Sequence, residues 1–279
     1  MNGARRWIKV PIIKSLQPSE ITKIGLIIFY AAYLTRHKDD LGTFKKGFIF
    51  PLIFLIFPIG IILGIQSHFS ASIIIILVTS VMMIVAGSKI RYFLTVGTCG
   101  GAGLIGAMYV LAKYFQKGSF RLTRITAFLN PWADSQGSGW QIIQSLYAIG
   151  SGGLFGVGLG NSTQKYLYIS EPHNDFIFAV LAEELGFVGC VFVILLFAIF
   201  IWRGILIAIK APDMFGSLLA IGITSLIGLQ ALINIAVVTS SMPVTGMALP
   251  FFSYGGTSLI ILLASVGILL NISRQIDKI

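Results

Sequence analysis

Apolar residues are grouped along the chain in blocks of about 16–25 residues, separated mostly by short polar segments. A helix needs about 20 apolar residues to cross roughly 30 Å of hydrocarbon, so these blocks predict membrane-spanning helices. The ten-residue alternation that is typical of membrane β-barrels is absent from the sequence. We therefore predict an all-α, polytopic integral membrane protein with about seven transmembrane helices. The predicted spans are approximately 20–35, 49–66, 71–88, 92–112, 174–202, 214–238 and 250–271.

One connection between the predicted spans is long, the segment 113–173. A connection of this length is uncommon in a compact protein and is usually functional. Basic residues follow the first, third, fifth and last spans, whereas the short connections 67–70 and 239–249 contain no Lys or Arg. The positive-inside rule then places segment 113–173 on the extracytoplasmic side. We expect a single membrane domain over residues 1–279.

Composition supports the membrane class and limits the chemistry. Hydrophobic residues make up 56% of the chain and charged residues 11%, with a mean hydropathy of +0.91, too little charge for a soluble surface. The net charge of +10 largely orients the chain, so we expect no nucleic-acid partner. Cys99 and Cys190 lie in apolar blocks and do not indicate a disulfide framework. His68 and His173 lack metal-ligand spacing, so we predict neither a metal site nor a cofactor; a divalent cation is the alternative, which ligand spacing does not indicate.

Four basic residues begin the long connection. Lys113, Lys117, Arg121 and Arg124 are spaced i, i+4, i+8 and i+11, which puts them on one face if the segment is helical. Such a stripe at the outer membrane surface would suit phosphate-bearing headgroups. Nonspecific lipid contact is the alternative interpretation.

The same connection contains a glycine-rich stretch, 150–160. Glycines let the backbone approach a ligand closely and expose N–H groups. No Gly-Lys-Ser/Thr follows, so a nucleotide-binding loop is not predicted. Close helix packing in the membrane is the alternative interpretation, and the glycines taken by themselves favour it.

A carboxylate ends the connection. Pro172 suits a first helical turn, and Asp175 then lies near the outer surface and the positive end of a helix. Asp175 either complements the helix dipole or acts as a base that takes a proton from a hydroxyl. On a helical wheel Glu183 lies within about 80° of Asp175, so we expect Glu183 in the same cavity and Glu184 opposite. Glu20 and Lys23, three residues apart, are expected to form a structural ion pair.

These motifs resemble the FtsW/RodA/SpoVE (SEDS) family, and the resemblance extends over essentially the whole chain in order. The stretches that carry it are Asn2–Ile8 with Gln17–Glu20, Arg124–Pro131, Gln141–Gly160, Glu171–Ala179, Glu183–Gly186, Pro243–Gly246 and Leu249–Ser258. Family members usually have ten spans, so we expect this chain to lack the first three. Gln66–Ser70 stands where many members carry a Pro-Asp pair, and we therefore do not assign that acid's role to His68.

The resemblance implies a peptidoglycan glycosyltransferase that polymerises lipid II into β-1,4-linked glycan on the outer face of the bacterial cytoplasmic membrane, for division, elongation or spore cortex synthesis. It implies that Asp175 is the catalytic base and that a class B penicillin-binding protein is the partner. The basic residues would neutralise the diphosphate of the leaving group. The expected substrate-binding residues are Arg6, Lys113, Lys117, Arg121, Arg124, Lys165, Glu171, His173, Glu183, Ser253, Tyr254 and Gly255.

Two other functions remain open at this stage. A lipid II transporter would need polar groups along a path through the membrane, whereas the charged groups here gather at the outer end, which favours surface chemistry. An inactive, truncated scaffold that binds the penicillin-binding protein is the second alternative. The residues of segment 245–254 favour the division and sporulation members of the family.

Overall fold

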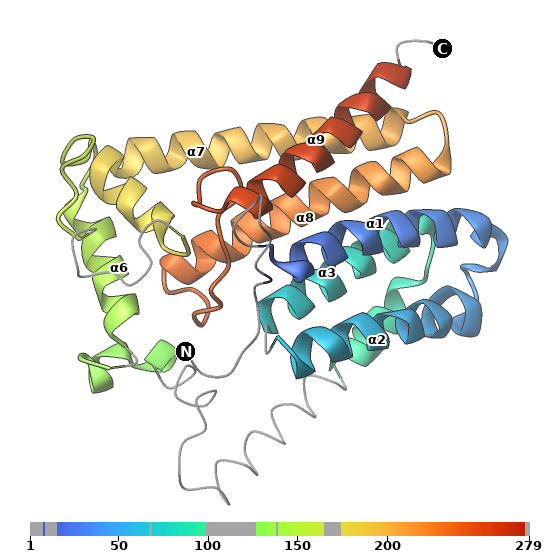
Figure 1. The fold of residues 1–279 in the computed structure, drawn as a ribbon, viewed down its shortest axis with the longest axis horizontal. Coiled ribbons are helices and arrows are strands. Elements are labelled where there is room, and N and C mark those ends of the chain that lie inside the picture. The colour runs from blue at the N-terminus through green and yellow to red at the C-terminus, as the bar shows by residue number, and fades with distance from the viewer. Residues whose placement is uncertain are drawn as a thin grey trace, which may run out of the picture. The chain divides into compact units, whose positions relative to one another are not determined.

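Long helices make up most of the described chain. The computed structural model describes Ile8 and residues 16–66, 69–98, 127–137, 139–164 and 174–276. Its main helices are α1 (Pro18–Arg36), α2 (Phe50–Gly64), α3 (Phe69–Ala86), α6 (Trp140–Ser151), α7 (Ile177–Lys210), α8 (Met214–Val238) and α9 (Gly256–Ile276) (Figure 1). Shorter helical turns occupy Lys38–Asp40, Lys45–Ile49 and Pro131–Asp134. In the part of the chain that the structure describes, the only strand pairing is one bridge between Ile8 and Leu16.

The predicted all-α membrane fold is confirmed. Five helices among the described residues are long and apolar enough to cross a membrane: Lys45–Gly64, Phe69–Ala86, Ile177–Lys210, Met214–Val238 and Gly256–Ile276. Helix α1 covers the predicted span 20–35 but is not one of these five. The predicted span 92–112 passes beyond the described residues after 98. The count of seven spans therefore stays a prediction.

Two helix boundaries and one connection differ from the prediction. Helix α7 continues to Lys210 instead of ending near 202, because the long side chain of Arg203 can reach the polar boundary without ending the helix. The last helix begins at Gly256 and not near 250, since Phe251 has a φ of +67° that no α-helix allows. The connection 113–173 contains a helix of its own, α6.

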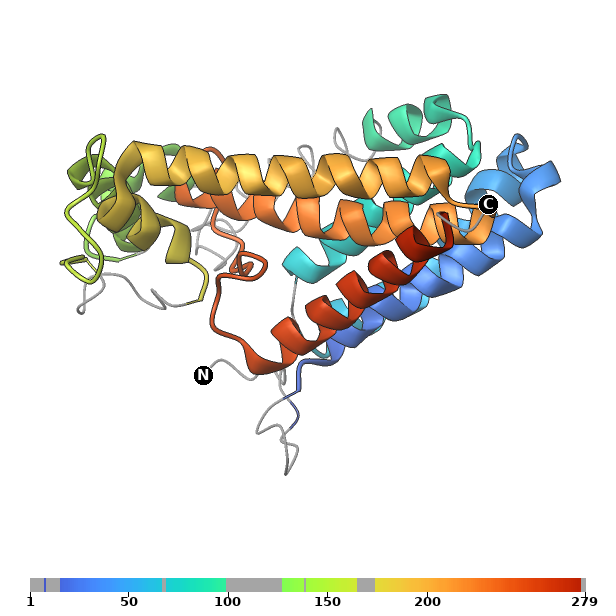
Figure 2. The same ribbon diagram turned by 90° about the horizontal axis from the view of Figure 1, so that it is seen from above.

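The described residues divide into two compact units. The first comprises the chain up to Tyr92, then Leu196–Ala231 and the residues from Tyr254 onward; the second comprises Phe93–Leu195 and Leu232–Ser253. In the first unit α1 packs against α2, α3 and α9 (Figures 1 and 2). The fully buried Tyr30 of α1 donates a hydrogen bond of 2.5 Å to the carbonyl of Pro51 in α2. Gly222 of α8 lets α1 approach closely, since a methyl group there would lie 2.5 Å from the Ile27 side chain.

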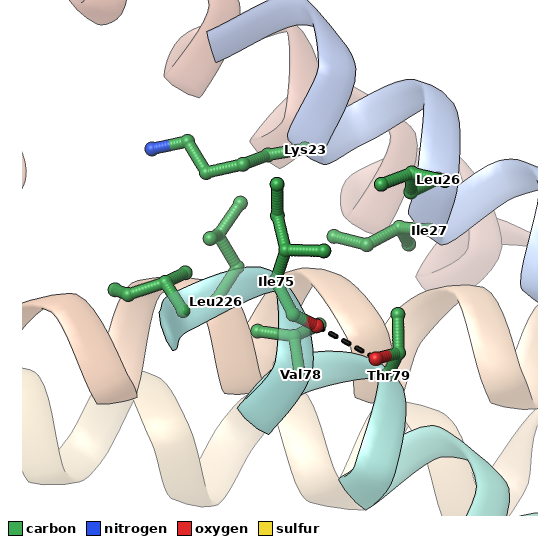
Figure 3. Close-up of a pocket in the computed structure, with 8 residues that line it drawn as sticks. Lys23, Leu26, Ile27, Ile75, Val78, Thr79 and Leu226 are labelled. Carbon is green, nitrogen blue, oxygen red and sulfur yellow. Dashed lines mark hydrogen bonds between the residues drawn. The ribbon is translucent and has the colours of Figure 1, made fainter. Parts of the chain in front are cut away.

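Helix α1 carries a charge into this apolar packing. Lys23 is 4% exposed, and its Nζ lies 2.8 Å from Oε1 of Glu20, so the predicted ion pair is confirmed. Lys23 borders a small cavity whose other lining residues are mainly apolar (Figure 3). Thr79, on the opposite wall, donates its hydroxyl hydrogen to the Ile75 carbonyl at 2.7 Å. The cavity therefore offers Lys23 little polar contact, and Glu20 neutralises its charge.

Removing one member of this pair should be worse than removing both. In Lys23→Met the Glu20 carboxylate loses its counter-ion in a mostly apolar setting, and we expect a loss of about 2 kcal/mol of stability, moderated because Glu20 is 16% exposed. The double variant Glu20→Gln/Lys23→Met should recover part of that loss. Thermal unfolding in detergent measures both. If the double variant recovered none of the stability that Lys23→Met loses, the ion pair would contribute nothing to burying Lys23.

The second unit is organised around a break in α7. Gly186 has φ +67° and ψ −167°, so the helix is interrupted there, and Figure 1 shows the first turns of α7 at an angle to the rest. Helix α6 contacts the end of α8, where Ser145 donates a 2.7 Å hydrogen bond to the carbonyl of Val238. The glycine-rich stretch that follows α6 lies against the break.

Backbone groups freed by the break pair with the glycine-rich stretch. The carbonyls of Glu183 and Glu184 accept hydrogen bonds from the N–H groups of Val157 and Gly158, at 3.0 and 3.1 Å. In return, Phe187 and Val188 donate to the carbonyls of Gly153 and Leu154, at 2.9 and 3.1 Å. A Cβ atom on Gly156 or Gly186 would overlap backbone atoms of the other segment. Glycine is thus required on both sides of this contact.

Candidate functional site

Asp175 lies in the turn that leads into α7. Residues 174–176 form this turn, and α7 begins at Ile177. Phe176 is buried at 2% exposure, and its carbonyl accepts the N–H of Ala179 at 3.0 Å, which starts the helix. Asp175 itself is half-buried. Asp175 therefore belongs to the end of the helix where the macrodipole favours negative charge.

Two side chains from other elements hold the backbone on either side of Asp175. Asn234 of α8, 1% exposed, donates from Nδ2 to the Asp175 carbonyl at 2.8 Å and to the Met247 carbonyl at 2.6 Å. Ser253 donates to the Asn174 carbonyl at 2.6 Å and accepts the N–H of Leu249 at 2.7 Å. The segment between α8 and α9 and the Asp175 turn are thereby joined. We call Asn234 and Ser253 the backbone clamp.

Gly246 brings a third segment close to the carboxylate. Its φ is +69°, a left-handed conformation that glycine adopts without a steric penalty. A Cβ atom on Gly246 would lie 3.1 Å from Oδ2 of Asp175, tighter than an ordinary van der Waals contact. A side chain at this position would both strain the backbone and crowd the carboxylate. Glycine at position 246 avoids this crowding.

Glu183 is bound to the segment that ends the glycine-rich stretch. Its carboxylate accepts hydrogen bonds from the Ser162 hydroxyl at 2.5 Å, from the N–H and hydroxyl of Thr163 at 2.9 Å each, and from the Gln164 N–H at 3.4 Å. Glu183 is 1% exposed. The helical-wheel estimate treated Asp175 as part of the helix, but the helix begins two residues later, so the wheel does not relate the two carboxylates. The structure gives Glu183 the task of fixing residues 162–164.

The chain is similar in sequence to proteins of one known family. The sequence profile of the FtsW/RodA/SpoVE family, described as cell cycle protein, matches residues 1–278. The chain belongs to the FtsW/RodA/SpoVE family. It is 48% identical over 273 residues to stage V sporulation protein E of Bacillus subtilis (strain 168), covering 98% of this chain and 72% of that protein. It is 45% identical over 273 residues to the probable peptidoglycan glycosyltransferase FtsW of Geobacter sp. (strain M18), with the same coverage of 98% and 72%.

Solved structures of the family share the fold. A chain of a peptidoglycan synthase complex that coordinates polymerization and crosslinking superposes with a TM-score of 0.76 at 28% identity, covering 99% of this chain and 75% of that one. The rod shape determining protein RodA of Thermus thermophilus gives a TM-score of 0.64 at 28% identity, with 98% and 70% covered.

Within this FtsW/RodA/SpoVE fold, the predicted site residues that the structure describes fall into two groups. Asp175, Glu183 and Ser253 belong to the second compact unit, where Ser253 supports the turn of Asp175. Tyr254, 85% exposed, and Gly255 belong to the first unit, and the Gly255 carbonyl accepts the N–H of Leu259 at the start of α9. The other predicted residues lie outside the described residues, and their roles stay predictions: Arg6, Lys113, Lys117, Arg121, Arg124, Lys165, Glu171 and His173.

Sequence reasoning missed two residues of the site. Asn234 was not singled out, although an amide inside an otherwise apolar span is costly and usually has a defined partner. Gly246 was noticed only as part of a motif, although a glycine after Pro-x-Thr indicates a backbone that needs positive φ. Both signals were present in the sequence, but neither one says which carboxylate the residue supports. In the part of the chain with described coordinates, no three His, Cys, Asp or Glu residues form a metal-binding group.

Proposed function

We propose that this chain polymerises lipid II into β-1,4-linked glycan, as a peptidoglycan glycosyltransferase of the outer face of the bacterial cytoplasmic membrane. The observation that carries the proposal is the half-buried Asp175 at the start of α7, with its backbone clamped by Asn234 and Ser253 and its carboxylate beside Gly246. Family membership and the name of the Geobacter relative support the same activity.

In the proposed reaction Asp175 acts as a general base. Its carboxylate takes the proton from the sugar 4-hydroxyl of one substrate as that oxygen attacks the anomeric carbon of another. The bond between that carbon and the undecaprenyl diphosphate breaks, and the diphosphate leaves with the bonding electrons. A positioned base contributes about 10²–10⁴-fold to such a step. The clamp holds the turn of Asp175 through the backbone carbonyls of Asn174 and Asp175.

We further propose which other residues and partners take part. The basic residues Lys113, Lys117, Arg121, Arg124 and Lys165 would neutralise the leaving diphosphate, and no cofactor is required for the proton transfer. A class B penicillin-binding protein would cross-link the product, in keeping with the related synthase complex that combines polymerization with crosslinking. The relatives named for sporulation and for FtsW favour a role in spore formation or division.

The test is polymerisation by the purified chain. Labelled lipid II is supplied in detergent or vesicles, alone and with the class B penicillin-binding protein, and glycan products are separated by gel electrophoresis. Glycan chains formed by this protein support the proposal. Transfer of lipid II across the vesicle membrane without polymer would indicate a transporter. Binding of the penicillin-binding protein without polymer in either condition would indicate a scaffold.

The clamp gives a separate prediction. Asn234→Ala removes the donor that the Asp175 and Met247 carbonyls share, at a cost of about 1–3 kcal/mol of stability. Because the displaced turn carries the base, we expect kcat to fall roughly tenfold with little change in KM. Steady-state polymerisation and thermal unfolding measure the two effects. Asn271→Ala, an exposed position on α9, is the matched control and should leave both unchanged. Wild-type kcat in Asn234→Ala would refute the positioning role.

A further inference from the structure

The glycine-rich stretch carries large apolar side chains on its surface. Leu154 is 65% exposed, Phe155 80% and Leu159 76%. The surrounding sequence, residues 135–164, contains no Asp, Glu, Lys or Arg. A segment in water would rarely expose such a run of apolar groups without a charge between them. This part of the long connection, which the sequence places on the extracytoplasmic side, therefore has a surface that is apolar and uncharged.

The position of the stretch along α7 gives its depth. Residues 185–202 of α7 are uncharged, between Glu184 and Arg203, and the sixteen helical residues that follow the break at Gly186, 187–202, span about 24 Å. That length is close to the roughly 30 Å of the hydrocarbon core, so Glu184 and Arg203 mark its two edges. Phe187 and Val188, to which the stretch is hydrogen-bonded, lie in the first turn inside the outer edge. The two are 62% and 52% exposed, as expected for side chains that face lipid.

The backbone polar groups of the stretch form hydrogen bonds within the protein. Irregular backbone within hydrocarbon is tolerated only where its polar groups are paired inside the protein. The N–H groups of Val157 and Gly158 and the carbonyls of Gly153 and Leu154 are paired with the broken part of α7, over 2.9–3.1 Å. The N–H of Gly156 is paired with the Gly152 carbonyl at 2.8 Å. Four hydrogen bonds thus pair backbone groups of the glycine-rich stretch with backbone groups beside the break in α7.

We propose that residues 153–160 form a wedge that is inserted into the outer leaflet, with Leu154, Phe155 and Leu159 in contact with acyl chains. The bilayer is the occupant that the observations favour, because the wedge continues the apolar surface of Phe187 and Val188 on a membrane-spanning helix and carries no charge. The inference is independent of the proposed activity, since it rests on burial, charge and hydrogen bonds alone.

Nitroxide labels test the wedge in vesicles. Phe155→Cys and Leu159→Cys are made in a chain whose native Cys99 and Cys190 are replaced by Ala, and each label's collision with oxygen and with a water-soluble nickel chelate is measured by electron paramagnetic resonance. Phe192→Cys, 61% exposed on α7, is the lipid reference, and Asp39→Cys is the water reference. The wedge predicts that positions 155 and 159 match position 192, with oxygen favoured over nickel.

Two results would overturn the proposal. Collision with nickel at the level of position 39 would put the stretch in water. Exclusion of both reagents from 155 and 159 would mean that protein covers the surface, as in an interface with a second chain. Two labelled positions are used so that one poorly folded variant does not decide the outcome.

Discussion

Replacing Asp175 by Asn should abolish glycan polymerisation while the protein remains folded. The amide has nearly the shape of the carboxylate but cannot accept the proton of the acceptor hydroxyl, so the expected loss is about 10²–10⁴-fold in rate. The clamp bonds the carbonyls of Asn174 and Asp175 and not the carboxylate, so the turn should keep its position. The rate is measured from labelled lipid II, and folding is measured by thermal unfolding of the same preparation.

Asp213 supplies the matched control for this substitution. It too precedes a helix, and its Oδ1 accepts the Gly216 N–H at 3.3 Å at the start of α8. Asparagine caps helices as well as aspartate does, so Asp213→Asn should keep the cap and leave polymerisation unchanged. If Asp175→Asn polymerised at the wild-type rate, Asp175 would be only a helix-end charge. An equal loss in both variants would point to a general effect of losing charge.

The membrane helices were largely predictable from the sequence because a single physical requirement governs them. Hydrocarbon demands a long uncharged run, and such a run is visible as composition; the predicted span 214–238 coincides with α8. The predicted helix boundaries were wrong where something other than hydropathy determines the end of a helix. Helix α7 continues past Arg203, since a long side chain can reach the headgroups. Helix α9 begins later than predicted because the backbone conformation of Phe251 is not helical.

The candidate site was predictable only in part, for a different reason. Asp175 was identified because a carboxylate near a helix start is a local feature. Its clamp was not, because Asn234 lies 59 residues away in sequence and the contact exists only after α7 and α8 are placed. The wheel related Glu183 to Asp175 by assuming one regular helix from 175 onward, whereas α7 begins at Ile177, so a shared cavity stays a prediction. Hydropathy carries no information on backbone angles, so the break at Gly186 was invisible within an apolar run.

That break gives the second large effect, which concerns stability. Gly186 has φ +67° and ψ −167°, a region that essentially only glycine occupies, at a cost of about 1–3 kcal/mol for other residues. In Gly186→Ala the new methyl group would also overlap backbone atoms of Gly156 and Leu154, and backbone cannot move aside as a side chain can. Relief requires separating the two segments, which sacrifices four hydrogen bonds at about 1 kcal/mol each. We expect a loss of about 4 kcal/mol or more in thermal unfolding.

Substitutions at two other glycines separate the conformational cost of Gly186→Ala from its steric overlap. Gly160 has φ +81° with open space around it, so Gly160→Ala pays the conformational cost without the overlap and should lose only about 1 kcal/mol. Gly150 lies in α6 with nothing near its Cβ position, so Gly150→Ala should be neutral or stabilising. The order Gly186, Gly160, Gly150 follows only if the glycine-rich stretch is locked into the break. If Gly186→Ala were no worse than Gly160→Ala, the two segments would be apart in the membrane, and the anchor of the proposed wedge would be lost with them.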